Sequence, residues 1–125
     1  MSFSTPGDVN RFVRGYVSGR LVSNHTQKKL WYRLFVPGGT SDPIGPGLNS
    51  AGPAIFRYQT RCGTVYGHTG NVLGYTQFAL STLNGSRSAT VSVDIQATQD
   101  SKGAKVLAVQ QLRRVVQAAV RTATR

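Results

Sequence analysis

Two histidines and two lysines are the residues of this sequence best suited to acid–base chemistry. His25 lies three and four residues before Lys28 and Lys29, and His68 stands in a glycine-rich stretch. Phosphodiester transfer needs a base, an acid and a cation beside the developing charge, so this set is the raw material of a ribonuclease site. Two lone histidines in loops are more often exposed polar residues. We therefore expect a protein that is not an enzyme.

Carboxylates are scarce in this chain of 125 residues. It has 15 Lys and Arg against 4 Asp and no Glu, which gives a formal net charge of +11 at pH 7. Four acids leave little for paired-carboxylate hydrolysis or for a hard-metal site. The excess of cations attracts anionic partners. The composition indicates a nucleic-acid partner, with no metal, other cofactor or small-molecule substrate.

Arginines alternate with aromatic residues in the first half of the chain. The planar guanidinium of arginine binds phosphate and stacks on bases, and aromatic rings stack on unpaired bases. This combination predicts a surface that binds single-stranded or hairpin RNA. The predicted RNA-binding residues are Arg14, Arg20, Lys28, Lys29, Trp31, Arg33, Arg57 and Arg61.

The N-terminal part of the chain shows the period of two residues that is typical of strands. Residues 12–22 and 30–36 are expected to form strands, joined by a polar loop at 23–29 into an antiparallel hairpin. Pairing would bring the cations of both strands onto one sheet face. Residues 37–53 are rich in proline and glycine and are expected to form a surface loop.

The middle of the chain predicts further antiparallel strands. Residues 54–65 and 72–83 are expected to pair around a turn at 66–71. A tight turn at 84–86 leads to a half-buried strand at 89–96, in which apolar and polar residues alternate. The chain is too short for two domains, so we expect one domain over residues 1–125.

The C-terminal part changes to a helical period. Residues 101–122 are expected to form one long amphipathic helix, so the fold class is α+β: an antiparallel sheet of hairpins followed by a C-terminal helix. One helix covers only part of such a sheet, which suggests that a second copy buries the rest. The predicted homodimer interface is the apolar stripe of Val109, Leu112, Val116 and Val120.

Cys62 is the only cysteine, so an internal disulfide is excluded. A small buried apolar residue is the preferred interpretation over a reactive or intermolecular thiol. No stretch has the roughly 18 consecutive apolar residues of a membrane span, and we expect synthesis in a cytoplasm.

Two segments carry a resemblance to a known family. The sequence GRLVSNHTQKKLWYRLFVP at 19–37 and the passage VSVDIQATQDS at 91–101, which leads into the helix, resemble the coat proteins of single-stranded RNA bacteriophages. The resemblance implies that sheet and helix interlock between two chains. It also implies that dimers assemble into an icosahedral shell whose inner sheet face binds genomic RNA, including an operator hairpin.

Carried onto this sequence, the resemblance places Lys29, Trp31 and Arg33 toward RNA, and the helix stripe against the partner's sheet. The expected function is a capsid protein that packages single-stranded RNA in a virion assembled in the bacterial cytoplasm. The alternative is a small RNA-binding protein of ribosomal type that forms no shell.

Overall fold

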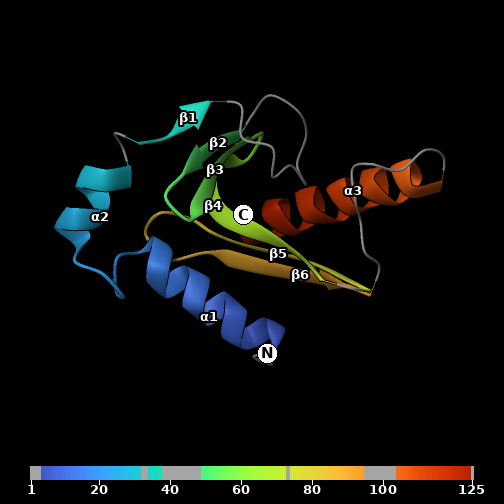
Figure 1. Cartoon of the computed structure of the whole chain (residues 1–125), viewed down its shortest axis with the longest axis horizontal. Coiled ribbons are helices and arrows are strands. Elements are labelled where there is room, and N and C mark those ends of the chain that lie inside the picture. The colour runs from blue at the N-terminus through green and yellow to red at the C-terminus, as the bar shows by residue number, and fades with distance from the viewer. Residues whose placement is uncertain (1–3, 32–33, 38–48, 73, 95–103, 125) are drawn as a thin grey trace.

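The computed structural model describes residues 4–31, 34–37, 49–72, 74–94 and 104–124 (Figure 1). Helices precede and follow a run of strands, which makes the chain an α+β protein. The elements are α1 (Pro6–Val17), α2 (Asn24–Trp31), β1 (Val36–Pro37), β2 (Asn49–Gly52), β3 (Ile55–Thr60), β4 (Gly63–Val72), β5 (Tyr75–Ser81), β6 (Ser88–Val93) and α3 (Ala104–Thr124). In the described part of the chain, no helix is long and apolar enough to cross a membrane.

The six strands form one antiparallel sheet in which every strand lies beside its neighbour in the sequence. The β3–β4 connection is a two-residue turn, because Thr60 pairs with Gly63. The turn is held by the Thr60 hydroxyl, which donates to the Gly63 carbonyl over 2.7 Å and accepts from the Cys62 backbone N–H over 3.1 Å. Gly63 has a φ of +116°, which side-chain-bearing residues rarely adopt.

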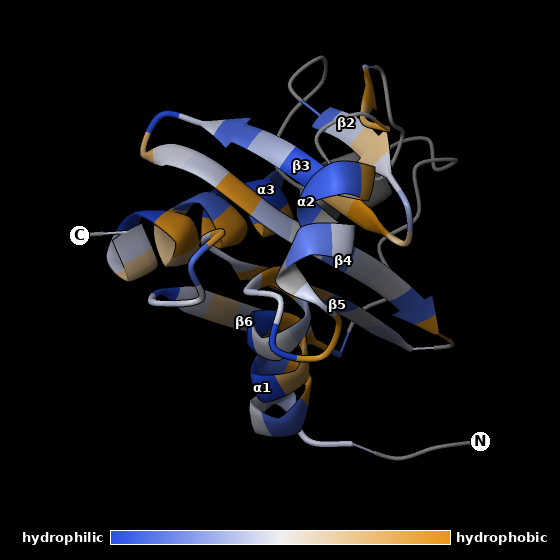
Figure 2. Cartoon of the chain, turned by 90° about the vertical axis from the view of Figure 1, so that its left-hand side faces the viewer, coloured by the Kyte–Doolittle hydropathy of each residue, from blue (hydrophilic) through white to orange (hydrophobic). Residues whose placement is uncertain are grey.

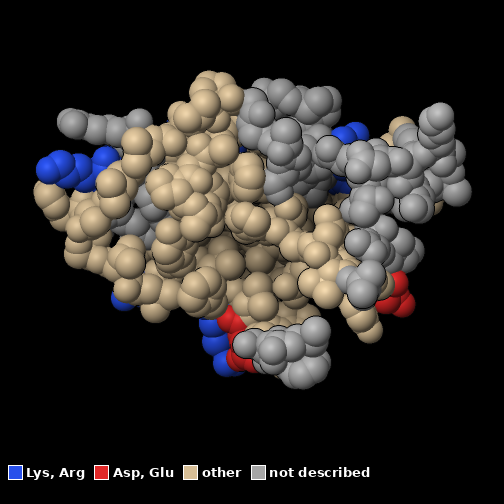
Figure 3. Space-filling model, in the orientation of Figure 1, with Lys and Arg blue, Asp and Glu red and all other residues tan. Residues whose placement is uncertain are grey.

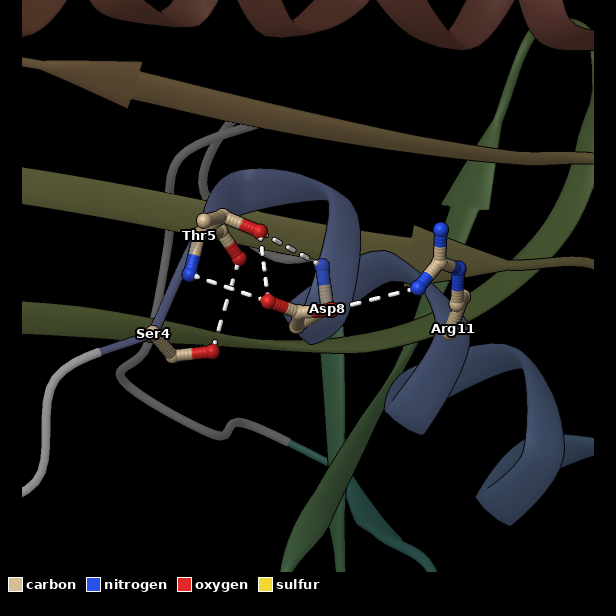
Figure 4. A network of polar contacts seen from close by, with 4 residues as sticks. All are labelled: Ser4, Thr5, Asp8 and Arg11. Carbon is tan, nitrogen blue, oxygen red and sulfur yellow. Dashed lines mark hydrogen bonds and ion pairs between the residues drawn. The ribbon is translucent and has the colours of Figure 1, made fainter.

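Helix α1 begins with a capping box (Figure 4). The Asp8 backbone N–H donates to the Thr5 hydroxyl over 3.2 Å, and the Thr5 backbone N–H donates to the Asp8 carboxylate over 3.4 Å. Hydrogen bonds from the Thr5 hydroxyl and backbone lower the pKa of Asp8, with a smaller contribution from Arg11 at 3.3 Å. These contacts satisfy amide groups that the first helical turn leaves without helical partners.

Helices α1 and α3 cover opposite faces of the sheet. Val65 and Tyr66 are consecutive residues of β4, so their side chains point to opposite faces. Val65 packs in a cluster with Val116 and Val120 of α3, whereas Tyr66 packs with Val17 of α1. The α3 cluster consists of Tyr58, Val65, Phe78, Leu80, Val116 and Val120, and the α1 cluster of Val17, Ile55 and Tyr66.

Both helices are amphipathic, with apolar and polar positions alternating around their axes (Figure 2). Two hydrogen bonds also join α1 to β6 at the far end of the sheet. The Asn10 amide donates to the Thr90 hydroxyl over 3.2 Å, and the Ser88 hydroxyl donates to the Asn10 carbonyl oxygen over 2.9 Å. The first helix is thereby tied to the last strand.

The predicted N-terminal hairpin is wrong. Most of 12–22 belongs to α1 or the turn after it, and α2 occupies 24–31, which includes most of the predicted loop. The apolar residues Val13, Tyr16 and Val17 also fit a helical spacing, and the capping box with Pro6 favours a helix start. The capping signals therefore outweigh the crude alternation.

The turn predicted at 66–71 is also wrong, because these residues lie inside β4. Gly67 is needed there for close packing of strands rather than for a turn: a Cβ at this position would lie 2.0 Å from the Ala79 carbonyl oxygen. Of the predicted loop 37–53, residues 49–52 form β2, while 38–48 lie outside the described residues. Cys62 is exposed rather than buried.

Three predicted elements are confirmed. The turn at 84–86 contains Gly85 with a φ of +70°, and β6 follows it with side chains that are half-buried except for the exposed Ser92. The C-terminal helix is present from Ala104, and residues 101–103 lie outside the described part of the chain.

The residues predicted for a dimer interface lie against the chain's own sheet where they are described. Val116 and Val120 are 0% and 2% exposed, and Leu112 is partly buried against the same cluster. The side chain of Val109 lies outside the described residues. In this conformation Val116 and Val120 have no surface left for a second copy, and homodimer formation stays a prediction.

Candidate functional site

The residues predicted to bind RNA lie on several elements. Arg14 of α1 donates from Nε to the Gly85 carbonyl over 3.0 Å, so it links the first helix to the turn before β6. Arg57 of β3 donates to the Ser50 hydroxyl over 3.3 Å. Its guanidinium also lies 5.0 Å from the centre of the Phe35 ring. These two arginines join parts of the fold.

The other predicted cations do not share a strand face. Lys28 and Lys29 are exposed on helix α2, and Arg20 is exposed after α1. Trp31 is the last residue of α2, and its side chain lies outside the described residues. All of Arg33 lies outside them as well. The predicted strand face is wrong because this segment is helical. The described residues on the face in Figure 3 are mostly uncharged, with basic and a few acidic side chains at the margins.

Strand β4 pairs with β3 over its first half and with β5 over its second half. Residues Tyr66–Val72 pair with β5, but pairing with β3 stops at Gly67. In the described part of the chain, no strand pairs with the other side of residues 68–72. We call this side of residues 68–72 the open edge. Backbone N–H and C=O groups of alternate residues point toward such an edge in an antiparallel strand.

The open edge is exposed and mostly uncharged. His68, Gly70, Asn71 and Val72 are all exposed, and a Cβ built on Gly70 would have no heavy atom within 4 Å. The His68 ring donates from Nδ1 to the adjacent Thr69 carbonyl over 2.5 Å and packs beside Phe56, with 5.3 Å between ring centres. The residues thus border an accessible surface beside β4.

A side-chain hydrogen bond between β4 and β5 stabilises the hairpin at the open edge. The Asn71 side-chain carbonyl accepts a hydrogen bond of 2.7 Å from the hydroxyl of Thr76, a buried residue of β5. His68 and Asn71 therefore occupy defined positions on a paired strand, although the sequence placed both in a turn. His25, the other histidine considered for catalysis, lies on α2.

The sequence pattern missed this edge because its glycines indicate a turn. The only local signal for a strand was the β-forming run at 64–66 just before it. What makes residues 68–72 a strand is pairing with β5, which depends on residues up to eleven positions further along the chain. Among the residues that the structure describes, no group of three His, Cys, Asp or Glu side chains could hold a metal ion.

Comparison with known proteins identifies a shared fold. No family model matches the sequence. No curated protein matches it either. Among solved structures, the chain is similar to a D-stereospecific amidohydrolase from Streptomyces sp., with a TM-score of 0.60 and 22% identity. The match covers 90% of this chain and 28% of the hydrolase chain. At this identity the likeness shows the fold, and this chain spans little more than a quarter of the hydrolase.

Proposed function

We propose that this chain forms the substrate-binding sheet of an amide-hydrolysing enzyme. The observation that carries the proposal is the open edge of β4, where pairing with β3 stops at Gly67 while pairing with β5 continues to Val72. An extended amide-containing ligand can add to such an edge as a further strand. Its own N–H and C=O groups would then pair with those of β4.

The surroundings of the edge suit a neutral ligand backbone. The residues along it are exposed except for the half-buried Thr69, none is a carboxylate, lysine or arginine, and Gly70 leaves room for close approach. An approaching backbone needs hydrogen-bonding groups in register rather than a counter-charge. The similarity to an amidohydrolase supports amide hydrolysis as the class of reaction. In this proposal the chain positions the amide for cleavage.

The proposal is tested by titrating the ¹⁵N-labelled chain with a short extended peptide amide and following backbone amide shifts by NMR. We expect the largest shifts at residues 68–72 and none along β6. The matched control is the same peptide with its backbone nitrogens methylated, which removes the ligand's donors. We expect this control to bind at least about tenfold more weakly. Equal binding of both peptides, or shifts spread over the surface, would overturn the proposal.

The capsid function expected from the sequence stays a prediction. It is favoured by the net charge of +11 and by the exposed lysines of α2. Of the two segments that carry the resemblance, 19–37 contains helix α2 instead of a hairpin. Electron microscopy after expression separates the possibilities. Uniform closed particles containing RNA would support the capsid function, and an unassembled chain that binds RNA would support the ribosomal-type alternative.

A further inference from the structure

A groove lies at the other end of β4, between the β3–β4 turn and the C-terminal half of α3. Its volume is about 530 Å³. Three arginines line it: Arg61 from the turn, and Arg114 and Arg121 from the helix. We call it the arginine groove. A volume of this size lies within the range of roughly 300–1,000 Å³ that small-molecule sites occupy.

The fold places the three arginines around one space. Arg114 and Arg121 are seven residues apart on α3, so they lie on the same side of the helix two turns apart. Arg61 lies in the two-residue β3–β4 turn, which the Thr60 hydroxyl stabilises with hydrogen bonds to Cys62 and Gly63. The backbone that carries each arginine is therefore fixed, although the side chains themselves are exposed.

Among the described residues, no acid balances the charge of the groove. None of the described residues that line it carries a carboxylate. In the part of the chain that the structure describes, none of the three arginines forms an ion pair. Three like charges around one space repel one another, and an anion bound between them relieves that repulsion. The buried side of the groove includes Val120, which is 2% exposed, and an apolar wall of this kind strengthens the field of nearby charges.

We propose that the arginine groove binds a small molecule through its diphosphate group. Guanidinium groups bind phosphate oxygens with two parallel hydrogen bonds, and cations on both sides of the groove can share the oxygens of two linked phosphates. The volume of about 530 Å³ has room for two linked phosphates and for the rest of a small molecule. The proposal is independent of amide hydrolysis, because the groove and the open edge lie at opposite ends of β4.

The first experiment measures binding of inorganic pyrophosphate to the full chain by calorimetry. We expect one site per chain, and a loss of affinity of at least about tenfold in the Arg114→Gln/Arg121→Gln variant. The matched control is Arg20→Gln/Lys28→Gln, which removes the same charge from exposed positions outside the groove. We expect its affinity to stay within about twofold of the original chain, because distant surface charges are screened by salt.

The second experiment uses Cys62, which is exposed and lines the groove, as a reporter. We expect pyrophosphate to slow the alkylation of Cys62 by neutral iodoacetamide in the original chain, but not in the groove variant. Circular dichroism checks that both variants are folded.

A nucleoside diphosphate is compared with pyrophosphate in both assays. Tighter binding of the nucleotide indicates an organic diphosphate as the ligand, and equal binding indicates that the diphosphate group is sufficient. Either result supports the site. The proposal is overturned if pyrophosphate does not bind, or if both double variants lose the same pyrophosphate affinity. It is also overturned if Arg114 and Arg121 bind single-stranded RNA but no diphosphate.

Discussion

The two ends of strand β4 carry surfaces of different chemistry. At the Gly63 end, a tight turn and α3 surround a groove with three arginines. At the Val72 end, the strand has one neighbouring strand among the described residues, and its surface is nearly uncharged. We expect long-range attraction to dominate ligand binding at the first surface and directional backbone hydrogen bonds to dominate it at the second. The open edge exists because pairing with β3 ends at Gly67, whereas the groove is lined by β3, the β3–β4 turn and α3.

The largest expected effect is on the free energy of unfolding. It compares the same Gly→Ala substitution at two positions of β4, one tightly packed against β5 and one at the open edge. Gly67→Ala places a Cβ 2.0 Å from the Ala79 carbonyl oxygen, so β4 and β5 must move apart. We expect the free energy of unfolding in urea to fall by about 3 kcal/mol. The control is Gly70→Ala, where a Cβ meets nothing within 4 Å, and its expected change is within about 0.5 kcal/mol. Similar losses in the two variants would contradict the difference in packing.

The salt dependence of ligand affinity should differ between the two surfaces, because one binds through charge and the other through backbone hydrogen bonds. We expect an increase in NaCl from about 50 to 200 mM to weaken pyrophosphate binding in the arginine groove by about tenfold, because ions screen exposed charges. Binding of the peptide amide at the open edge is expected to change by less than about twofold. Calorimetry of both ligands in the same buffers measures the difference. A peptide affinity that falls in parallel with pyrophosphate affinity would show that charge governs both surfaces.

A side-chain change at the open edge should have a smaller effect than a change in the ligand backbone. We expect His68→Ala to weaken the peptide amide by about threefold, because it removes one side chain while leaving backbone pairing in place. Pyrophosphate affinity should stay unchanged. Should His68→Ala abolish peptide binding in a folded chain, the imidazole rather than the backbone would be the main contact.

The smallest effect concerns the one described aspartate that is paired with an arginine. The pKa of Asp8 is lowered from its ordinary 3.8 in the folded chain, chiefly by the hydrogen bond from Thr5. Ionised Asp8 therefore stabilises the fold above pH 3.8, and this contribution disappears as the pH falls through the lowered value. We expect urea midpoints of the original chain and Asp8→Ala to differ at pH 6 and to converge in acid. A difference that persists at pH 2 would contradict this origin.

The C-terminal half of the fold was predictable because its signals are local. The Asn84–Gly85 turn, the alternation of β6 and the apolar stripe of α3 all depend on nearby residues. The α+β class followed from them. The N-terminal half was misjudged because the same apolar positions fit two periods, and the capping pair of Thr5 and Asp8 decides between them.

The candidate surfaces were only partly predictable. Arg61 was among the predicted anion-binding residues, but the helix that joins it in the groove is more than fifty positions away in sequence. The open edge depends on β3 being shorter than β4, which no local pattern encodes. The cations and the strand-forming residues can be identified from the sequence. Which arginines lie around one groove, and which strand edge stays unpaired, depends on the packing of the fold.

The order of the strands has a consequence for how the chain folds. Because each strand pairs with the one before it, the sheet can form by closing short loops one after another, at low entropic cost. Docking of α1 is different, since the hydrogen bond from Ser88 to Asn10 spans 78 positions and the one from Asn10 to Thr90 spans 80. We therefore expect the strands to assemble first and the first helix to attach late, which would make its attachment the slow step of folding.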